Sequence, residues 1–239
     1  MFFPLPIPDA RFPALMREVL IADDHPLFRD ALRRAIQQAL PGVVLREADS
    51  VNALQAAIDA HPDLELLLLD LHMPGANGFS ALVHIRGQHP GLPIVIVSAH
   101  EESGVIRRAI AHGASGYIPK SAPVGTIVDA VRKVVDGDIW IPESVRGATA
   151  ALNPTEVSVA SHVAQLTPQQ FRVLNMIAEG LLNKQIAYEL GVSEATVKAH
   201  MTAIMRKLGV SNRTQVALLA RHLAIEMDVL GDTGTDAAD

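Results

Sequence analysis

The sequence contains no cysteine among its 239 residues. This absence excludes disulfide bonds, thiolate nucleophiles, iron–sulfur clusters and cysteine-ligated zinc sites. Aromatic residues make up only 4% of the chain, so the core has to be built from aliphatic side chains. No uncharged apolar run approaches the roughly 18 residues that a membrane-spanning helix needs. The apolar start, residues 1–16, lacks a basic region and is broken by four prolines, so we expect a cytoplasmic protein without a secretory signal.

Charge is unevenly distributed along the chain, whose formal net charge is −6. Residues 1–165 carry a net charge of −5 and residues 225–239 carry another −5. Residues 166–224 instead contain seven Lys and Arg against three Asp and Glu, a net charge of +4. A basic block within an acidic protein favours a polyanionic partner such as nucleic acid, because binding releases the counterions of the polyanion.

The first 140 residues alternate between short aliphatic runs and longer amphipathic stretches. The runs predict strands at Glu18–Ala22, Val43–Glu47, Leu66–Leu69, Ile94–Val97 and Tyr117–Ile118. The amphipathic stretches predict helices at about Pro26–Leu40, Val51–Ala60, Phe79–His89, Glu101–Ala111 and Val124–Val135. Strands without polar alternation, such as LELLLLD, are buried on both faces. We therefore expect an α/β doubly wound domain with a five-stranded parallel sheet.

The pattern changes after Asp136. Residues 137–165 show no sustained period and many turn formers, so we expect a linker with partial order around Trp140. Residues 166–226 read as helical throughout, with Thr167 as an N-cap before Pro168 and glycines at 180, 191 and 209 where helices should end. These signals predict an all-α domain of four short helices. Residues 227–239 are polar and acidic, and we expect them to be disordered.

Polar side chains follow the predicted strands at the points where the strands end. Asp23 and Asp24 follow the first strand, Asp70 the third, Ser98 the fourth and Lys120 the fifth. Because the carboxyl ends of parallel strands meet at one edge of a sheet, these groups should converge. Three neighbouring carboxylates repel one another unless a cation intervenes, and hard oxygen ligands suit Mg²⁺. A lysine and a hydroxyl beside them could neutralise a phosphoryl group.

This set resembles the receiver domain of two-component response regulators, through the acidic pair, LLLLDLHMPGANG, IVIVSAH and GYIPKS, over residues 17–136. The resemblance implies a flavodoxin-like fold in which Asp70 accepts a phosphoryl group as an aspartyl phosphate. It implies a Mg²⁺ site made of Asp23 (through bound water), Asp24, Asp70 and the backbone carbonyl of His72. It also implies that Ser98 and Lys120 grip the phosphoryl oxygens and that Tyr117 reorients when Ser98 moves.

Two histidines, His72 and His100, each lie two positions after a member of this set. In the family such positions flank the phosphoryl group, so one hypothesis is that the two imidazoles tune the lifetime of the phosphate. The alternative is that both are solvent-facing residues of the rim. The other histidines show no metal-ligand spacing, and we expect them to be surface or interface residues.

The stretch NKQIAYELGVSEATVKAHMTAIMRKLGV has the geometry of a helix-turn-helix, with Gly191 permitting the left-handed turn. At ~100° per residue, one face of the second helix forms an apolar stripe of Val197, Met201, Ile204 and Leu208. Another face combines small residues with cations: Ala195, Lys198, Ala199, Thr202 and Arg206. Small side chains let a helix enter a groove, and cations meet phosphates and guanine edges. The alternative is a surface helix that merely solvates its charges.

Residues 166–224 resemble the LuxR-type DNA-binding domain in LTPQQFRVL, EGLLNKQIA and TVKAHMTAIMRKLGVSNRTQ. The resemblance implies base-edge contacts for Lys198, Ala199 and Thr202, and backbone contacts for Lys184, Thr196, Arg206 and Lys207. In the family the last helix commonly forms a dimer contact, which here implicates Val216, Leu219, Ala220 and Leu223. Ordinary core packing is the alternative for these four residues. A dimer would read an inverted repeat in double-stranded DNA.

The whole chain resembles a NarL/FixJ-type response regulator. The resemblance implies that a histidine kinase phosphorylates Asp70 with Mg²⁺, which controls dimerisation or exposure of the helix-turn-helix and hence transcription. Such a protein is not an enzyme, beyond assisting its own phosphotransfer and dephosphorylation. One alternative is a phosphate-independent dimeric transcription factor that uses the receiver fold as a structural or ligand-sensing module. Another is a phosphatase or phosphotransferase acting on an external substrate, which is disfavoured because no substrate-binding segment is evident.

Overall fold

A computed structural model describes residues 17–76, 78–145 and 152–223. The expected N-terminal extension (1–16) and the expected disordered tail (227–239) lie outside the described residues. None of the helices in the described part of the chain is long and apolar enough to cross a membrane.

The first part of the chain forms the predicted five-stranded parallel sheet. Its strands are β1 (Glu18–Ala22), β2 (Val44–Ala48), β3 (Leu64–Asp70), β4 (Ile94–Ser98) and β5 (Gly116–Pro119). Their order in the sheet is β2-β1-β3-β4-β5. The chain thus moves outward from β1 in one direction to β2 and in the other direction to β3. This reversal leaves a crevice at the carboxyl ends of β1 and β3, where doubly wound folds bind their ligands.

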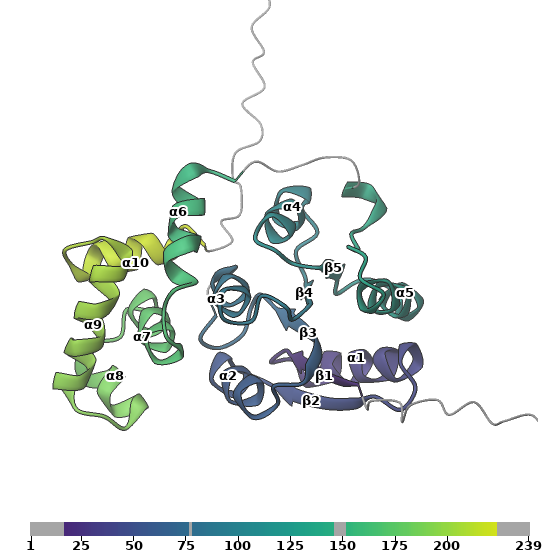
Figure 1. Cartoon of the computed structure of the whole chain (residues 1–239), viewed down its shortest axis with the longest axis horizontal. Coiled ribbons are helices and arrows are strands. Elements are labelled where there is room, and N and C mark those ends of the chain that lie inside the picture. The colour runs from purple at the N-terminus through teal and green to yellow at the C-terminus, as the bar shows by residue number, and fades with distance from the viewer. Residues whose placement is uncertain (1–16, 77, 146–151, 224–239) are drawn as a thin grey trace, which may run out of the picture.

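Helices cover both faces of the sheet (Figure 1). One face carries α1 (Pro26–Ala39) and α5 (Val124–Val135), and the other carries α2 (Val51–Ala60), α3 (Ser80–Gln88) and α4 (Ser103–Ala111). Successive strand residues point to opposite faces, so Val19 and Ile21 pack with α1 and α5 whereas Leu20 packs on the opposite side. Burial on both faces explains why these strands read as continuous apolar runs.

The second part of the chain contains the four predicted helices: α7 (Pro168–Ala178), α8 (Asn183–Leu190), α9 (Glu194–Leu208) and α10 (Arg213–Arg221). Thr167 caps α7 as predicted, in a capping box with Gln170. Gly191 and Gly209 end α8 and α9 with φ of +64° and +68°. Both lie in the left-handed region that side chains other than glycine disfavour.

A helix that the sequence did not lead us to expect lies within the expected linker. α6 spans Pro154–Val163. The Asn153 side chain caps it by accepting a hydrogen bond from the Thr155 N–H at 2.8 Å. Val159 and Val163 of α6 are buried, and α6 packs against α3. Our prediction of irregular chain was wrong here because the helix owes its stability to this distant partner rather than to a strong local period.

The expected partial order around Trp140 is confirmed. The Trp140 N–H donates to the Ser115 carbonyl at 3.1 Å, and the Trp140 carbonyl accepts from the Tyr117 N–H at 3.0 Å. Through these two bonds, Trp140 lies beside β5 at the outer edge of the sheet. A single 3₁₀ turn, η1 (Glu143–Val145), follows.

The α/β domain (β1–α5) and the helical domain (α6–α10) pack directly on each other. The helix α3 contacts α6, the helix α2 contacts α7, and the core beneath α2, α3 and α4 continues into the helical domain. The Gln88 side chain donates to the carbonyls of Ala164 and Leu166 at 2.9 and 3.4 Å. The backbone N–H of Phe79 donates to the carbonyl of Leu223 at 2.8 Å. The end of α10 is thus tied to the loop that follows β3.

An ionic cluster also links the two domains. Glu156 of α6 is buried, and its Oε1 accepts a hydrogen bond from the Arg108 guanidinium at 2.9 Å. The same oxygen lies 2.6 Å from Nε2 of His112, the C-cap of α4. The helix α4 therefore carries two groups that bind one carboxylate of the helical domain.

Candidate functional site

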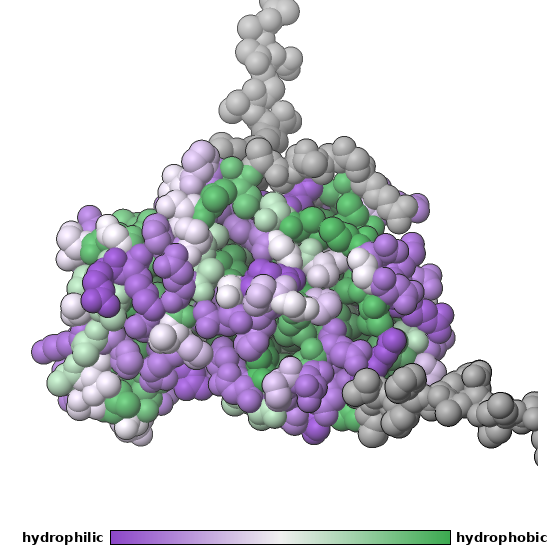
Figure 2. All heavy atoms as spheres, viewed as in Figure 1, coloured by the Kyte–Doolittle hydropathy of each residue, from purple (hydrophilic) through white to green (hydrophobic). Residues whose placement is uncertain are grey.

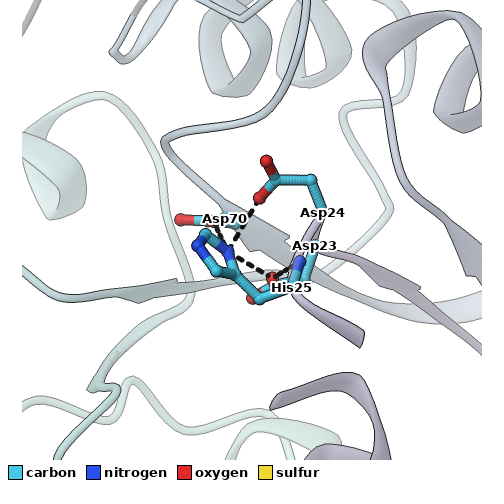
Figure 3. A group of neighbouring side chains, drawn as sticks. All are labelled: Asp23, Asp24, His25 and Asp70. Carbon is cyan, nitrogen blue, oxygen red and sulfur yellow. Dashed lines mark hydrogen bonds and ion pairs between the residues drawn. The ribbon is translucent and has the colours of Figure 1, made fainter. Parts of the chain in front are cut away.

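The carboxylates at the strand ends converge as predicted (Figure 3). Asp23 and Asp24 follow β1, and Asp70 is the last residue of β3, its hydrogen-bonded neighbour in the sheet. One ligand atom from each of these carboxylates and from His25 lies within 4.8 Å of all the others. Asp23 and Asp70 are almost fully buried, with 1% and 2% of their surface exposed.

Lys120 provides the positive charge at the edge of the sheet where Asp23, Asp24 and Asp70 meet, which we call the rim. Its ammonium lies 2.8 Å from Oδ2 of Asp70 and 2.8 Å from Oδ2 of Asp23. Burial alone would lower the pKa of Lys120, but the bonds to Asp23 and Asp70 raise it, so the ammonium stays charged. Burial raises the pKa of Asp70, and Lys120 opposes that shift. The ammonium thereby favours the ionised form of Asp70.

His25 lies at the surface as we expected, with 63% of its side chain exposed, yet it also belongs to this cluster, which we did not predict. Its Nδ1 lies 2.8 Å from Asp24 Oδ1 and 3.2 Å from Asp23 Oδ1, and 3.4 Å from the Lys120 ammonium. Its backbone N–H also donates to Asp23 Oδ1 at 2.7 Å. The available signal was its position directly after the acidic pair, where the chain turns from β1 into α1.

Ser98 and Tyr117 lie behind the rim, and both are fully buried. The Ser98 hydroxyl accepts a hydrogen bond from the His100 N–H at 3.3 Å, and the Tyr117 hydroxyl donates to the His100 carbonyl at 2.7 Å. Burial raises the pKa of Tyr117 to about 12, so its hydroxyl keeps its proton. The loop after β4 thus connects the two residues through His100.

The histidines His72 and His100 lie beside each other at the rim, with ring centroids 4.9 Å apart. The His72 N–H donates to Asp70 Oδ1 at 3.2 Å. Partial burial and then the nearby His100 lower the pKa of His72, so its ring is neutral at pH 7. Both rings line an open pocket of about 670 Å³ in front of Asp70, which is also lined by His25, Leu27, Phe28, Ala99 and Lys120.

In the helical domain, the two faces predicted for α9 are confirmed. Val197, Met201, Ile204 and Leu208 are buried. Lys198, Ala199, Thr202 and Arg206 are exposed, together with Ala195. Figure 1 shows α8 and α9 on the side of the helical domain away from the sheet, and Figure 2 shows hydrophilic side chains prominent over this end of the molecule.

Three further residues of the predicted interface differ in their surroundings. Lys184 of α8 is exposed, and Thr196 is half-buried with its hydroxyl 2.9 Å from that of Ser193. The Lys207 ammonium instead donates to the Gln165 carbonyl and to Gln170 Oε1, both at 2.8 Å. In this conformation Lys207 therefore binds within the helical domain, unlike Lys198.

The predicted dimer residues on α10 and just after it are mostly core residues. Val216, Ala220 and Leu223 are 0%, 4% and 0% exposed, and α10 packs on α7 and α9. This placement supports the core-packing alternative for those three, while Leu219 is half-buried. The large apolar residue that α10 presents to solvent is Leu218, with 52% of its surface exposed.

Comparison with known protein families finds a match in each domain. The response regulator receiver domain matches residues 19–132. The luxR family of bacterial regulatory proteins matches residues 164–220. The second match begins inside the expected linker, at the end of α6.

Comparison with individual proteins gives matches along nearly the whole chain. The chain is 41% identical over 210 residues to the glycerol metabolism activator of Pseudomonas putida, covering 86% of this chain and 95% of the relative. It is 34% identical over 204 residues to the nitrate/nitrite response regulator protein NarL of Escherichia coli, covering 84% and 93%. Among solved structures, RcsB from Salmonella enterica serovar Typhimurium, bound to a promoter with the phosphomimetic BeF3⁻, is 25% identical with a TM-score of 0.51, covering 87% and 100%.

Proposed function

This chain belongs to the response regulators of the NarL/FixJ type, and we propose that phosphorylation of Asp70 by a histidine kinase controls its binding to DNA. The observation that carries the proposal is the Lys120 ammonium, 2.8 Å from the buried carboxylate of Asp70 at the mouth of an open pocket. A cation at that place stabilises the charge that a phosphoryl group brings. The proposed domain limits are 17–136 for the receiver, 137–165 for the linker and 166–226 for the DNA-binding domain.

We propose Mg²⁺ as the ion of this rim. Asp23, Asp24 and Asp70 place three negative charges against the single ammonium of Lys120, and a divalent ion would balance the remainder. Carboxylate oxygens are the hard ligands that Mg²⁺ prefers. Asp24 and Asp70 would hold the ion directly and Asp23 through bound water, with the His72 carbonyl added by resemblance. When bound, Mg²⁺ supplies positive charge to the phosphoryl oxygens during transfer.

Asp70 is the proposed nucleophile. One of its carboxylate oxygens forms a P–O bond while the P–N bond to the phosphorylated kinase histidine breaks, and the leaving imidazole nitrogen takes up a proton. Lys120, which already contacts Asp70 Oδ2, neutralises the new phosphoryl oxygens. The Ser98 hydroxyl donates to one of them after a shift of the loop after β4. Hydrolysis of the acyl phosphate by water restores Asp70, and we propose no other catalytic turnover.

The helix α4 is the proposed route from Asp70 to the helical domain. It follows β4 and Ser98 in the chain, and its far end holds Glu156 through Arg108 and His112. A shift of Ser98 and Tyr117 towards the phosphoryl group would move α4 and loosen its hold on Glu156. The DNA-binding face of α9 is already exposed in the described conformation. We therefore favour control through release of α10 and dimerisation over uncovering of α9.

The DNA-binding element is proposed to be α9, with Lys198, Ala199 and Thr202 at base edges. Lys184, Thr196 and Arg206 are the proposed contacts to the DNA backbone. Two copies joined through the exposed side of α10 would present two α9 helices to an inverted repeat. Binding to chromosomal DNA would place the protein in the cytoplasm.

The test uses the full chain with Mg²⁺ and beryllofluoride, a phosphoryl mimic. We expect a shift towards a dimer in light scattering and a higher affinity for DNA obtained by binding-site selection. Asp70→Asn should abolish both responses, whereas Asp63→Asn, at an exposed position away from the rim, should retain them. If neither oligomeric state nor affinity responds in the unaltered protein, the phosphate-independent alternative replaces this proposal.

A further inference from the structure

His84 of α3 is buried between the two domains, with 1% of its surface exposed. Its ring stacks on Phe171 of α7, with centroids 4.2 Å apart and ring planes at 7°. Neither ring nitrogen has a partner at good hydrogen-bond geometry among the described residues, and the one polar group that acts on the ring from α6 is the Val163 carbonyl. Protonating such a ring is unfavourable because the charge would be buried away from water with no opposite charge beside it. We propose that docking of the α/β domain on the helical domain is acid-sensitive and that His84 is the residue that senses the proton.

The packing beside this ring is close. A Cβ added to Gly87, on the next turn of α3, would lie 2.6 Å from the Cβ of Ala164. The Gln88 side chain bonds to the carbonyls of Ala164 and Leu166. These contacts hold the His84 side of α3 against α6 and α7. Separation of the domains would therefore bring the ring into water.

The groups around His84 do little to stabilise a proton on its ring. Burial lowers the pKa of His84 from 6.5 to about 4. The backbone carbonyl of Val163 on α6 opposes this shift, and His89, the C-cap of α3, adds to it. The helix α7 presents the uncharged ring of Phe171. No carboxylate among the described residues contributes to the pKa of His84, so a charge on the docked ring has no opposite charge to balance it.

The direction of the pH effect follows from this difference. After undocking, the ring faces water and its pKa returns to the ordinary value of 6.5. The undocked form then binds the proton more tightly, so docking is strongest above pH 6.5 and weakens as the pH falls towards 4. Between pH 7.5 and 5.5 the docking equilibrium constant is expected to fall about tenfold. The effect requires no phosphoryl group and goes beyond the proposed function.

His112 is the second histidine at this boundary. Burial lowers its pKa, the facing carboxylate of Glu156 raises it, and Arg108 lowers it. Undocking removes the carboxylate of Glu156, which belongs to α6, together with the burial that the helical domain provides, whereas Arg108 stays beside His112 on α4. We expect His112 to contribute less to the acid response than His84, because only His112 has a carboxylate to stabilise its proton.

A hydrogen bond between the domains provides the reporter. The Phe79 N–H donates to the Leu223 carbonyl, so its exchange with deuterium requires undocking. The Leu67 N–H donates to the Pro93 carbonyl inside the sheet at 3.0 Å and reports opening of the α/β domain itself. Exchange detects the undocked form even when it is rare. Protection factors, which divide out the intrinsic exchange rate, allow two pH values to be compared.

The experiment compares full-length protein at pH 7.5 and 5.5 without a phosphoryl donor. Protection of the Phe79 amide is expected to fall about tenfold, with a much smaller change at Leu67. His84→Phe keeps a stacked ring that cannot titrate, and it should remove the pH response, whereas His112→Gln should retain most of it. An unchanged Phe79 protection, or an equal fall in His84→Phe, would overturn the proposal. If His84→Phe loses Leu67 protection at pH 7.5, His84→Leu takes its place under the same criterion.

Discussion

Gly87 of α3 and Ala164, the C-cap of α6, are in contact across the domain boundary. A Cβ on Gly87 would lie 2.6 Å from the Cβ and 2.7 Å from the carbonyl oxygen of Ala164. Neither atom can rotate away, because one is fixed to the backbone and the other belongs to it. Only glycine therefore fits at this point of α3 while the domains are docked.

Gly87→Ala is expected to undock the domains without unfolding either of them. Alanine favours a helix over glycine by up to ~1 kcal/mol, so the α/β domain should melt no earlier than in the unaltered protein. Small-angle X-ray scattering should give a larger radius of gyration. Gly125→Ala on α5 is the matched control, since no described atom lies within 4 Å of its added Cβ. An unchanged radius in Gly87→Ala would contradict the docked arrangement.

Glu156→Gln is expected to weaken docking through the ionic cluster. The carboxylate is buried and binds both Arg108 and His112, and removing one partner of a buried charged bond costs about 1–3 kcal/mol. The protection factor of the Phe79 amide should fall about tenfold or more. Glu65→Gln is the control, because its pair with Arg17 is exposed and 3.6 Å long. Unaltered Phe79 protection in Glu156→Gln would mean that the cluster does not hold the domains together.

The sheet and the rim could be predicted because their signals are local. An uninterrupted aliphatic run such as β3 has to be buried on both faces, and parallel strands then bring their carboxyl ends together. That geometry predicted the convergence of Asp23, Asp70 and Lys120 from three segments far apart in the sequence. The prediction needed no knowledge of which helix covers which face.

The elements that the sequence analysis missed depend on contacts between distant parts of the chain. The helix α6 is stabilised by its packing against α3 rather than by an amphipathic pattern of its own. Its sequence therefore offered no local period to detect. An apolar stripe has the same spacing whether it faces a core or a second copy, so Val216 and Ala220 could not be assigned to the core. His25 was overlooked because ligand spacing is sought between separated residues, whereas His25 directly follows Asp24.

Asp70→Asn is expected to raise thermal stability near neutral pH while abolishing phosphorylation. Burial raises the pKa of Asp70, and Lys120 opposes this only in part. A carboxyl whose pKa is raised by folding loses stabilising free energy once the pH rises above its ordinary pKa. Calorimetry in EDTA should show the Tm of the variant a few degrees above that of the unaltered protein at pH 7.5. The difference should shrink as the pH falls towards 4, and a difference that grows would have the wrong sign.

Lys198 and Lys207 lie on the same helix, α9, yet their substitutions are expected to differ. Lys198 is exposed and is a proposed base-edge contact, so Lys198→Ala should weaken DNA binding, relax the preference for the bases it contacts and leave the Tm unchanged. The Lys207 ammonium binds the Gln165 carbonyl and the Gln170 side chain, which belongs to the capping box of α7. Lys207→Ala should therefore lower the Tm of the helical domain.

A salt titration of DNA affinity for Lys207→Ala shows whether Lys207 also contacts a phosphate in the complex. If Lys207 stays bound to Gln165 and Gln170 in the complex, Lys207→Ala leaves the salt slope unchanged, because no phosphate contact is lost. If the ammonium leaves those partners to reach a phosphate, the slope falls by about 1. The second outcome would mean that DNA binding breaks the tie between the end of α9 and the start of α7. The free and bound helical domain would then differ in structure at that point.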